Sequence, residues 1–288
     1  MNRRGFLKTV GVAGAVAMSR PEDCHAESAG DGVDGFAVLV DTTRCVGCRN
    51  CEVACAEANG LPAPDVADDA VLASERKPST GQWSVINRFE TASGEVFVKR
   101  QCMHCVQPAC ASACLTKAML KTPDGPVIWR EGKCMGCRFC MVSCPFDMPK
   151  FEYDSAVPRL SKCRMCQDRL AEGGRPACVE NCPAEALTFG RRSEMLAEAR
   201  RRIVENPGGY VDHIYGEHEV GGTGFLYLAA VPFEQLGFRT DLGEVAYPRL
   251  TEDFLYGVPI VLTLWPAFLL ALSQATKKEG AAEQGGEA

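Results

Sequence analysis

The cysteines of this chain fall into four compact groups, and their spacing constrains the fold more than any other feature. Sixteen of the seventeen cysteines lie between residues 45 and 182. In order, the groups are Cys45, Cys48, Cys51 and Cys55; Cys102, Cys105, Cys110 and Cys114; Cys134, Cys137, Cys140 and Cys144; and Cys163, Cys166, Cys178 and Cys182. So many thiols in one region predict that inorganic centres replace much of the side-chain core.

Groups one and three both read C-x2-C-x2-C-x3-C, the spacing of ferredoxin-type iron–sulfur ligands. In that run, three closely spaced cysteines surround one cube of iron and sulfide, and the fourth ligates the neighbouring cluster of a pair. A two-residue gap suits a tight turn around one cluster, while a three-residue gap is close to one helical turn. Because no position in the four groups is substituted, the spacing predicts four 4Fe–4S clusters. A three-iron cluster in one group stays open.

Two other uses of closely spaced cysteines fit this pattern less well. Zinc sites also use C-x2-C pairs, but one zinc takes four ligands, usually from two pairs. Triplets with a distal fourth cysteine do not match that arrangement. A disulfide framework is typical of short secreted chains, whereas this chain has 288 residues.

Groups one and three also form an internal repeat. The segments RCVGCRNCEVAC (44–55) and KCMGCRFCMVSC (133–144) share the pattern C-x-G-C-R-x-C-x-V-x-C, which is too long to arise by chance. Gly47 and Gly136 occupy the same place inside the two loops. A left-handed or crowded backbone favours glycine, so we expect such a conformation at both positions.

Three polar residues inside the cysteine groups have roles that the sequence leaves open. Arg49 and Arg138 follow the second cysteine of groups one and three, where they either hydrogen-bond to a cluster sulfur or a partner, or extend into solvent. His104 lies between Cys102 and Cys105. It either tunes a cluster potential through a hydrogen bond or protonation, or serves as a spacer or interface residue.

The first 26 residues are interpreted as a twin-arginine export signal. The chain begins MNRRGFLK, with Arg3 and Arg4 before a short, weakly apolar stretch. A Cys-x-Ala cleavage site ending at Ala26 would remove Cys24, the one cysteine outside the groups. The twin-arginine route carries folded proteins, so the clusters would be inserted in the cytoplasm before export. The alternative is an ordinary basic N-terminus before an amphipathic helix.

An uncharged segment at residues 254–272 predicts one C-terminal transmembrane helix. At about 1.5 Å per residue its 19 residues span roughly 28 Å, close to the hydrocarbon core of about 30 Å. Glu252 and Asp253 precede the segment, and Lys277 and Lys278 follow it. The positive-inside rule places these lysines in the cytoplasm and the cysteine groups outside, in agreement with the export signal. The alternative is a buried core helix.

Composition and patterning complete the predicted organisation. We expect a periplasmic four-cluster domain at 27–250 and a cytoplasmic tail at 273–288. The chain is 46% hydrophobic and 24% charged with a net charge of −6, and lacks the basic surface typical of nucleic-acid-binding proteins. GEVFVKRQC and GPVIWREGKC predict short strands entering cysteine loops, and residues 194–206 predict an amphipathic helix. No nucleophile and base pattern is present, so we expect an α+β relay protein without its own substrate site.

The four cysteine groups, in this order, resemble the iron–sulfur subunits that serve molybdopterin oxidoreductases and some nickel–iron hydrogenases. The likeness covers residues 40–190 and implies two nested ferredoxin-like modules, in which group one pairs with group four and group two with group three. Carried onto this chain, the implied ligand sets are Cys45, Cys48, Cys51 and Cys182; Cys163, Cys166, Cys178 and Cys55; Cys102, Cys105, Cys110 and Cys144; and Cys134, Cys137, Cys140 and Cys114. The chain departs from the family pattern at Leu115, where many relatives have proline.

Within this family, the segments NRRGFLK, KRQCMHCVQPAC, GCRFCMVSCPFDMPKF and YGEHEVGGTGFLYLAAVPFEQL are most similar to the HybA-type subunit of membrane-bound periplasmic hydrogenases. This resemblance implies electron transfer between a hydrogenase catalytic dimer and an integral membrane subunit that reacts with quinone. The beta subunit of respiratory formate dehydrogenase is similar in cysteine groups and anchor, and is the alternative. A third hypothesis is a structural membrane anchor whose clusters are redox-inert.

Overall fold

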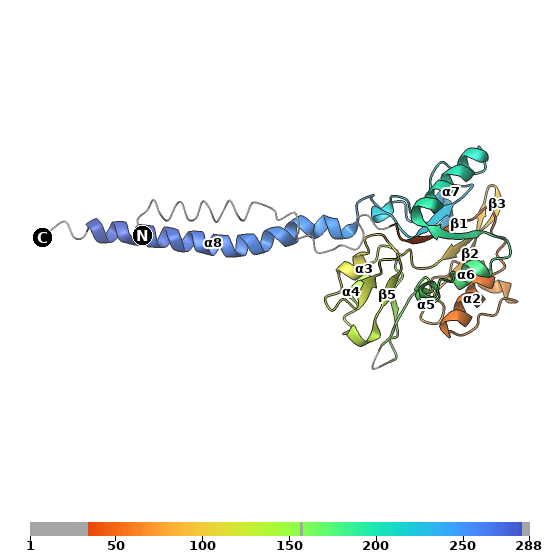
Figure 1. The fold of residues 1–288 in the computed structure, drawn as a ribbon, viewed down its shortest axis with the longest axis horizontal. Helices are drawn as coiled ribbons and strands as arrows, with labels where there is room; N and C mark the ends of the chain where they lie inside the picture. Colours follow the sequence, from red (N-terminus) through yellow and green to blue (C-terminus); the bar gives the residue numbers. More distant parts are fainter. Residues whose placement is uncertain (1–33, 156–157, 284–288) are drawn as a thin grey trace.

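The computed structural model describes residues 34–155 and 158–283, with side chains as far as residue 274. The predicted export signal and Cys24 lie outside these residues. Strands and short helices alternate through the cysteine region, so the chain has the mixed helix and strand composition that the sequence predicts. One long helix, α8 (Tyr247–Glu283), extends away from this domain (Figure 1).

A three-stranded sheet joins the beginning and the end of the cysteine region. Its central strand β1 (Phe36–Asp41) precedes group one and pairs antiparallel with β8 (Leu187–Arg191), which follows group four. On its other edge β1 pairs in parallel with β9 (Phe225–Leu228). Residues 37–40 of β1 are apolar and buried on both faces, as expected for a central strand.

Three two-stranded hairpins carry the chain from one cysteine group to the next. They are β2 (Val85–Thr91) with β3 (Gly94–Arg100), β4 (Met119–Lys121) with β5 (Val127–Trp129), and β6 (Lys150–Phe151) with β7 (Leu160–Ser161). Strands β3 and β5 confirm the two strands predicted before groups two and three. Each hairpin therefore delivers the chain into the next cysteine loop.

Short helices carry cysteines from each of the four groups. They are α2 (Asn50–Asn59), α3 (Ala109–Ser112), α4 (Phe139–Val142) and α6 (Ala177–Glu180), and a further helix, α5 (Gln167–Ala171), begins directly after Cys166. Helix α2 packs against α6, and α3 packs against α4. Group one thus lies beside group four, and group two beside group three. The 3-10 turns are η1 (Asp69–Ala73), η2 (Glu131–Lys133), η3 (Glu219–Gly221) and η4 (Phe233–Leu236).

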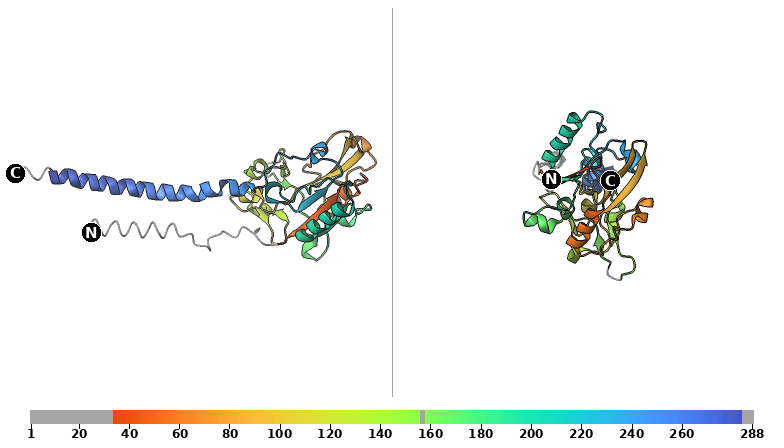
Figure 2. Two further views of the ribbon diagram at one scale, coloured as in Figure 1. Left: turned by 90° about the horizontal axis from the view of Figure 1, so that it is seen from above. Right: turned by 90° about the vertical axis from the view of Figure 1, so that its right-hand side faces the viewer.

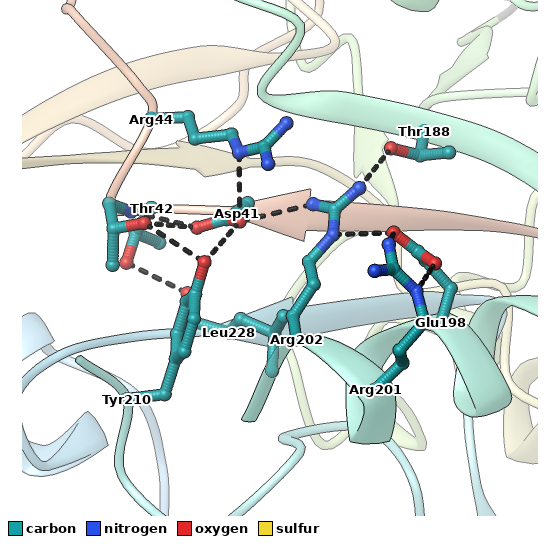
Figure 3. Close-up of polar contacts among 10 residues, drawn as sticks. Asp41, Thr42, Arg44, Thr188, Glu198, Arg201, Arg202, Tyr210 and Leu228 are labelled. Atoms are coloured by element: carbon teal, nitrogen blue, oxygen red, sulfur yellow. Dashed lines mark hydrogen bonds and ion pairs between the residues drawn. The ribbon is translucent and has the colours of Figure 1, made fainter. Parts of the chain in front are cut away.

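Helix α7 (Arg192–Glu205) covers one face of the sheet and confirms the helix predicted at 194–206. Met195 and Ala199 pack against the sheet residue Leu39, as the apolar face of the pattern requires. From the same helix, Arg202 reaches the carboxylate of Asp41, which is fully buried at the end of β1 (Figure 3).

The Asp41 carboxylate is the centre of a buried polar network. Its Oδ2 accepts from Arg202 Nη1 at 3.0 Å and from the Tyr210 hydroxyl at 2.9 Å. Arg202 also donates from Nε to Glu198 at 2.7 Å and from Nη2 to Thr188 at 3.2 Å (Figure 3). Both charges are out of water and need compensation, which Arg202 also receives from Glu198 and Asp41 also receives from Arg44 at 3.5 Å. The network fixes α7 on the sheet.

Helix α8 leaves its apolar side chains in the open. Within the part of the chain that the structure describes, the helical segment Tyr247–Gln274 is long and apolar enough to cross a membrane, with a mean hydropathy of 2.0. None of its most apolar stretch is buried inside the protein. The alternative of a buried core helix is therefore wrong. The helix begins earlier than residue 254, because Pro248 suits the first turn of a helix, where its missing N–H costs nothing.

Candidate metal centres

The four cysteine groups share one backbone feature. In every group the residue just before the second cysteine has a positive φ: Gly47 at 70°, His104 at 49°, Gly136 at 72° and Met165 at 52°. This left-handed turn bends the chain around the space between the cysteines. For His104 and Met165 the conformation is strained, and such strain persists only where surrounding packing enforces it. Both side chains are at most 1% exposed, which supplies that packing.

The expected left-handed backbone at Gly47 and Gly136 is confirmed, and the two positions allow a matched test. A Cβ at Gly47 would lie 2.5 Å from the ring of Phe97, whereas a Cβ at Gly136 would meet open space. We expect G136A to cost only the backbone penalty of about 1 kcal/mol. G47A adds a steric clash and should reduce the bound iron near Cys45. Iron content and melting temperature of the two purified variants check this, and equal effects would contradict it.

Set A consists of Cys45, Cys48, Cys51 and Cys182, which line one cavity together. Burial raises the pKa of the Cys45 thiol, and the neighbouring thiols of Cys182 and Cys48 raise it further. Lys99 lines the same cavity. Three cysteines of group one therefore meet the last cysteine of group four, although more than a hundred residues separate them.

Set B consists of Cys55, Cys163, Cys166 and Cys178. Burial raises the pKa of Cys178 to about 11, and the thiols of Cys166 and Cys55 add to this effect. Burial is also the largest cause of the raised pKa of the Cys163 thiol, and Cys55 and Cys178 raise this pKa further. The fourth cysteine of group one thus joins three cysteines of group four.

Set C consists of Cys102, Cys105, Cys110 and Cys144. Burial is the largest cause of the raised pKa of Cys105. The neighbouring Cys144, Cys110 and Cys102 raise this pKa further. The last cysteine of group three is therefore surrounded by the first three cysteines of group two.

Set D consists of Cys114, Cys134, Cys137 and Cys140. The pKa of Cys140 is raised to about 12, with burial as the largest cause. The neighbouring Cys114, Cys134 and Cys137 also raise this pKa. These interactions between thiols support the nested grouping that the family resemblance implies, which stays a prediction.

Electrostatic interactions between thiols link set A to set B, set B to set C and set C to set D. Thiols of neighbouring sets influence one another through Cys51 with Cys178 (A to B), Cys163 with Cys102 (B to C) and Cys110 with Cys140 (C to D). Of the sixteen grouped cysteines, Cys48 in set A and Cys137 in set D are exposed, and the others are buried or half-buried. The row therefore has two ends at the surface and a covered middle.

The donor sets fit iron–sulfur clusters. All sixteen cysteines are free of disulfides, and burial raises the thiol pKa at the most enclosed of them, so a bare thiolate is unstable there. A bound metal supplies the positive charge that removes the proton. Among the described residues no three His, Cys, Asp or Glu side chains converge on a single ion.

Arg49 is neither solvated nor committed to a cluster. Its side chain is buried and donates to the Glu52 carboxylate at 3.3 Å and to the carbonyls of Asp65 and Asp68 at 2.8 and 3.0 Å. It therefore ties the 61–82 loop to α2. The repeat partner Arg138 has the same backbone conformation but stacks on a tyrosine ring at 4.5 Å. The two halves of the repeat have diverged at this position.

His104 is fully buried, so it is not an interface residue. Its Nδ1 accepts a hydrogen bond from the Val127 N–H at 2.8 Å, which places the ring proton on Nε2. Burial holds the pKa of His104 well below its usual value, and the nearby ammonium groups of Lys162 and Lys121 lower it further. The imidazole is thus neutral. Its Nε2 is buried and has no hydrogen-bond partner among the described residues.

Buried lysines beside the cysteine sets were not foreseen from the sequence. Lys99 and Lys162 are 2% and 3% exposed. Lys162 donates to the carbonyl of Cys163 at 2.9 Å, and Lys121 donates to the carbonyl of Cys105 at 2.8 Å. Each lies within a few residues of a cysteine group or on a strand leading to one. That proximity, rather than hydrophobic periodicity, is the signal that could have identified them.

Comparison with known proteins identifies the same chemistry. The 4Fe-4S dicluster domain family matches residues 94–192. A protein of Nitratidesulfovibrio vulgaris (strain Hildenborough) is 47% identical over all of this chain and 81% of its own length. Hydrogenase-2 operon protein HybA of Escherichia coli O157:H7 is 33% identical over 97% of both chains. The nitrate-inducible formate dehydrogenase iron-sulfur subunit of Escherichia coli (strain K12) is 33% identical over 67% of both chains.

The predicted 4Fe–4S chemistry is thereby confirmed, and so is the resemblance to HybA-type subunits. The matching dicluster domain contains all of groups two, three and four, and the HybA match extends over nearly the whole chain. The relatives named as formate dehydrogenase subunits share the cysteine region. The chain belongs to the HybA family of 4Fe–4S iron–sulfur proteins and is related to the iron–sulfur subunits of formate dehydrogenases.

Proposed function

We infer that this chain is an electron-transfer subunit in which four 4Fe–4S clusters form a linear relay from set A to set D. Each bound cluster accepts and releases one electron at a time. The observation that carries this proposal is the order of the sets, with Cys48 at one exposed end and Cys137 at the other. A redox-inert structural role would not require a continuous row that opens to the surface at both ends.

The cysteines of each set are proposed as the four ligands of one cluster. Sets A and B then form an outer ferredoxin-like module, closed by the pairing of β1 with β8 and of α2 with α6. Sets C and D form an inner module, supported by the contact of α3 with α4 and by the β4–β5 hairpin. The two modules together constitute the proposed cluster domain at 27–250.

The two ends of the relay differ in their surroundings. Helix α8 contacts α3, and Arg249 donates to Gln107 at 3.1 Å, so the beginning of α8 lies beside α3 and α4 (Figure 1 and Figure 2), the helices that carry Cys110 of set C and Cys140 of set D. Exposed apolar side chains surround set D: Leu115, Met135, Phe139 and Val142 are 54–89% exposed. We propose that set D faces an integral membrane, quinone-reactive subunit, and that set A, at the far side of the domain, faces the catalytic subunits.

A hydrogenase catalytic dimer is the proposed partner. The match to Hydrogenase-2 operon protein HybA covers 97% of this chain, whereas the match to the formate dehydrogenase iron-sulfur subunit covers 67%. The chain would have no substrate site of its own. A molybdopterin enzyme of the formate dehydrogenase type is the alternative, because the cysteine region is similar in both relatives.

Export and anchoring complete the proposal. Residues 1–26 are proposed as a twin-arginine signal, and 254–272, within α8, as the membrane-spanning part of a single-pass anchor. The cluster domain would lie on the periplasmic face of the inner membrane and residues 273–288 in the cytoplasm. The open apolar surface of α8 supports this arrangement, since such a surface requires lipid or a partner to cover it.

Removal of α8 tests the anchor. A chain that ends at residue 250 should be released from membranes by an alkaline carbonate wash, whereas the full-length chain should remain. The reason is that about 20 apolar residues are needed to hold a chain in the bilayer core. The measurement is the distribution of the chain between washed membranes and supernatant. Retention of the shortened chain after the wash would contradict the assignment.

Anaerobic purification of the full chain from membranes in mild detergent tests the partner. Mass spectrometry of the co-purified proteins and metal analysis should give nickel with a hydrogenase large and small subunit. Molybdenum or tungsten with a large pterin-binding subunit would instead establish the alternative enzyme. A redox titration that detects no reducible cluster would overturn the relay and leave the anchor hypothesis.

A further inference from the structure

Lys99 carries a positive charge inside the protein, where an unpaired charge is costly. The side chain is 2% exposed and lies on β3, the strand that enters group two. Its Nζ donates to the side-chain oxygen of Gln101 at 3.0 Å. Gln101 is neutral, so this hydrogen bond orients the ammonium without neutralising it.

The ammonium is held by a closed hydrogen-bond circuit. Gln101 Nε2 donates to the Tyr227 hydroxyl at 2.7 Å, and this hydroxyl donates to the carbonyl of Lys99 at 2.9 Å. All three residues are at most 2% exposed. The Nζ also lies 5.7 Å from the ring centre of Phe225. The charge is therefore fixed in position rather than free to move toward solvent.

The groups around this ammonium are the cysteines of sets A and B. Lys99 lines the cavity formed by the four cysteines of set A. Burial would lower the pKa of Lys99, but the thiols of Cys178, Cys51, Cys163 and Cys55 hold it above its usual value. One of these thiols belongs to set A and the other three to set B, so Lys99 lies at the junction of the two sets.

We propose that Lys99 is a positioning residue whose fixed ammonium raises the reduction potentials of the two clusters held by sets A and B. One-electron reduction adds a negative charge to a cluster, and a nearby buried positive charge stabilises that reduced state. Two other lysines interact with set C: Lys162 lowers the pKa of Cys110 and of Cys144, and Lys121 lowers the pKa of Cys105. Neither lysine takes the place of Lys99 beside sets A and B. This inference rests on the proposed ligand sets of the relay.

The test is a redox titration of the purified, full-length complex, followed by electron paramagnetic resonance. K99Q and K99M remove the charge and keep most of the side-chain volume. For two of the clusters we expect the equilibrium constant for one-electron reduction to fall about tenfold, or about 59 mV. The potentials of the other two should not change. K77Q is the matched control, because Lys77 is 72% exposed in the described structure and its charge is in solvent.

Iron content separates a potential effect from a structural one. Full iron content with two lowered potentials supports the proposal. Full iron content with all potentials unchanged in both variants overturns it, as does a uniform shift of every cluster. Loss of iron from both K99Q and K99M also overturns it and makes Lys99 a structural residue. If the wild-type complex has no reducible cluster, the relay itself fails, which is a distinct result.

Discussion

Cys140→Ser should remove the cluster of set D, so bound iron should fall by about one quarter and electron flow between the two ends of the relay should stop. Cys140 is 8% exposed and lies among the other three thiols of its set. A serine hydroxyl is a harder and much poorer ligand than a thiolate for iron in such a cluster. Iron analysis and quinone reduction by the membrane complex are the measurements.

The control for this variant is Cys24→Ser. Cys24 belongs to none of the four groups and lies outside the residues that the structure describes. We expect the iron content and the turnover of this variant to equal those of the wild type. Normal turnover in Cys140→Ser, with its iron retained, would show that set D is not a required part of the relay.

Asp41→Ala should lower the stability of the cluster domain by about 1–3 kcal/mol, because the buried Nη1 of Arg202 loses its acceptor while its Nε keeps the Glu198 carboxylate. The side chains of Asp41 and Arg202 are 0% and 9% exposed. Tyr210 and Thr43 lose an acceptor as well. For a domain of this size the expected fall in melting temperature is roughly 2–12 °C, measured by circular dichroism under anaerobic conditions.

Glu205→Gln provides the comparison on the same helix. Glu205 pairs with Arg201, and both side chains are more than half exposed. Solvent screens this pair, so its removal should leave the melting temperature unchanged. If Asp41→Ala melts at the temperature of Glu205→Gln, the buried network does not hold α7 on the sheet.

The cysteine groups, the strands β3 and β5 and the helix α7 could all be predicted from local sequence. Ligand spacing and hydrophobic periodicity are short-range signals, and they predicted the 4Fe–4S chemistry without a structure. The combination of groups into sets is different, because Cys182 joins group one only through the fold. That pairing came from a family resemblance and stays a prediction, and the order from A to D is proposed from electrostatic interactions between thiols that only the structure provides.

Lys99 and Arg49 show why the remaining features could not be predicted. On β3 the alternation rule would place Lys99 in solvent, opposite the buried Val98. Here both faces are covered, since the aromatic core lies on one side and the cysteine sets lie on the other. Arg49 binds carbonyls 16 and 19 residues further along the chain. No local pattern identifies such a partner.

The pairing of β1 with β8 also sets the order in which the protein can be assembled. Sets C and D draw only on residues 102–144, so their thiols are complete when half of the chain has been synthesised. Sets A and B wait for Cys178 and Cys182, and β1 has no antiparallel partner until residues 187–191 emerge. Until then the first cysteines are exposed to oxidants and stray metals. The N-terminal half of the outer module is therefore the part of the nascent chain that most needs protection.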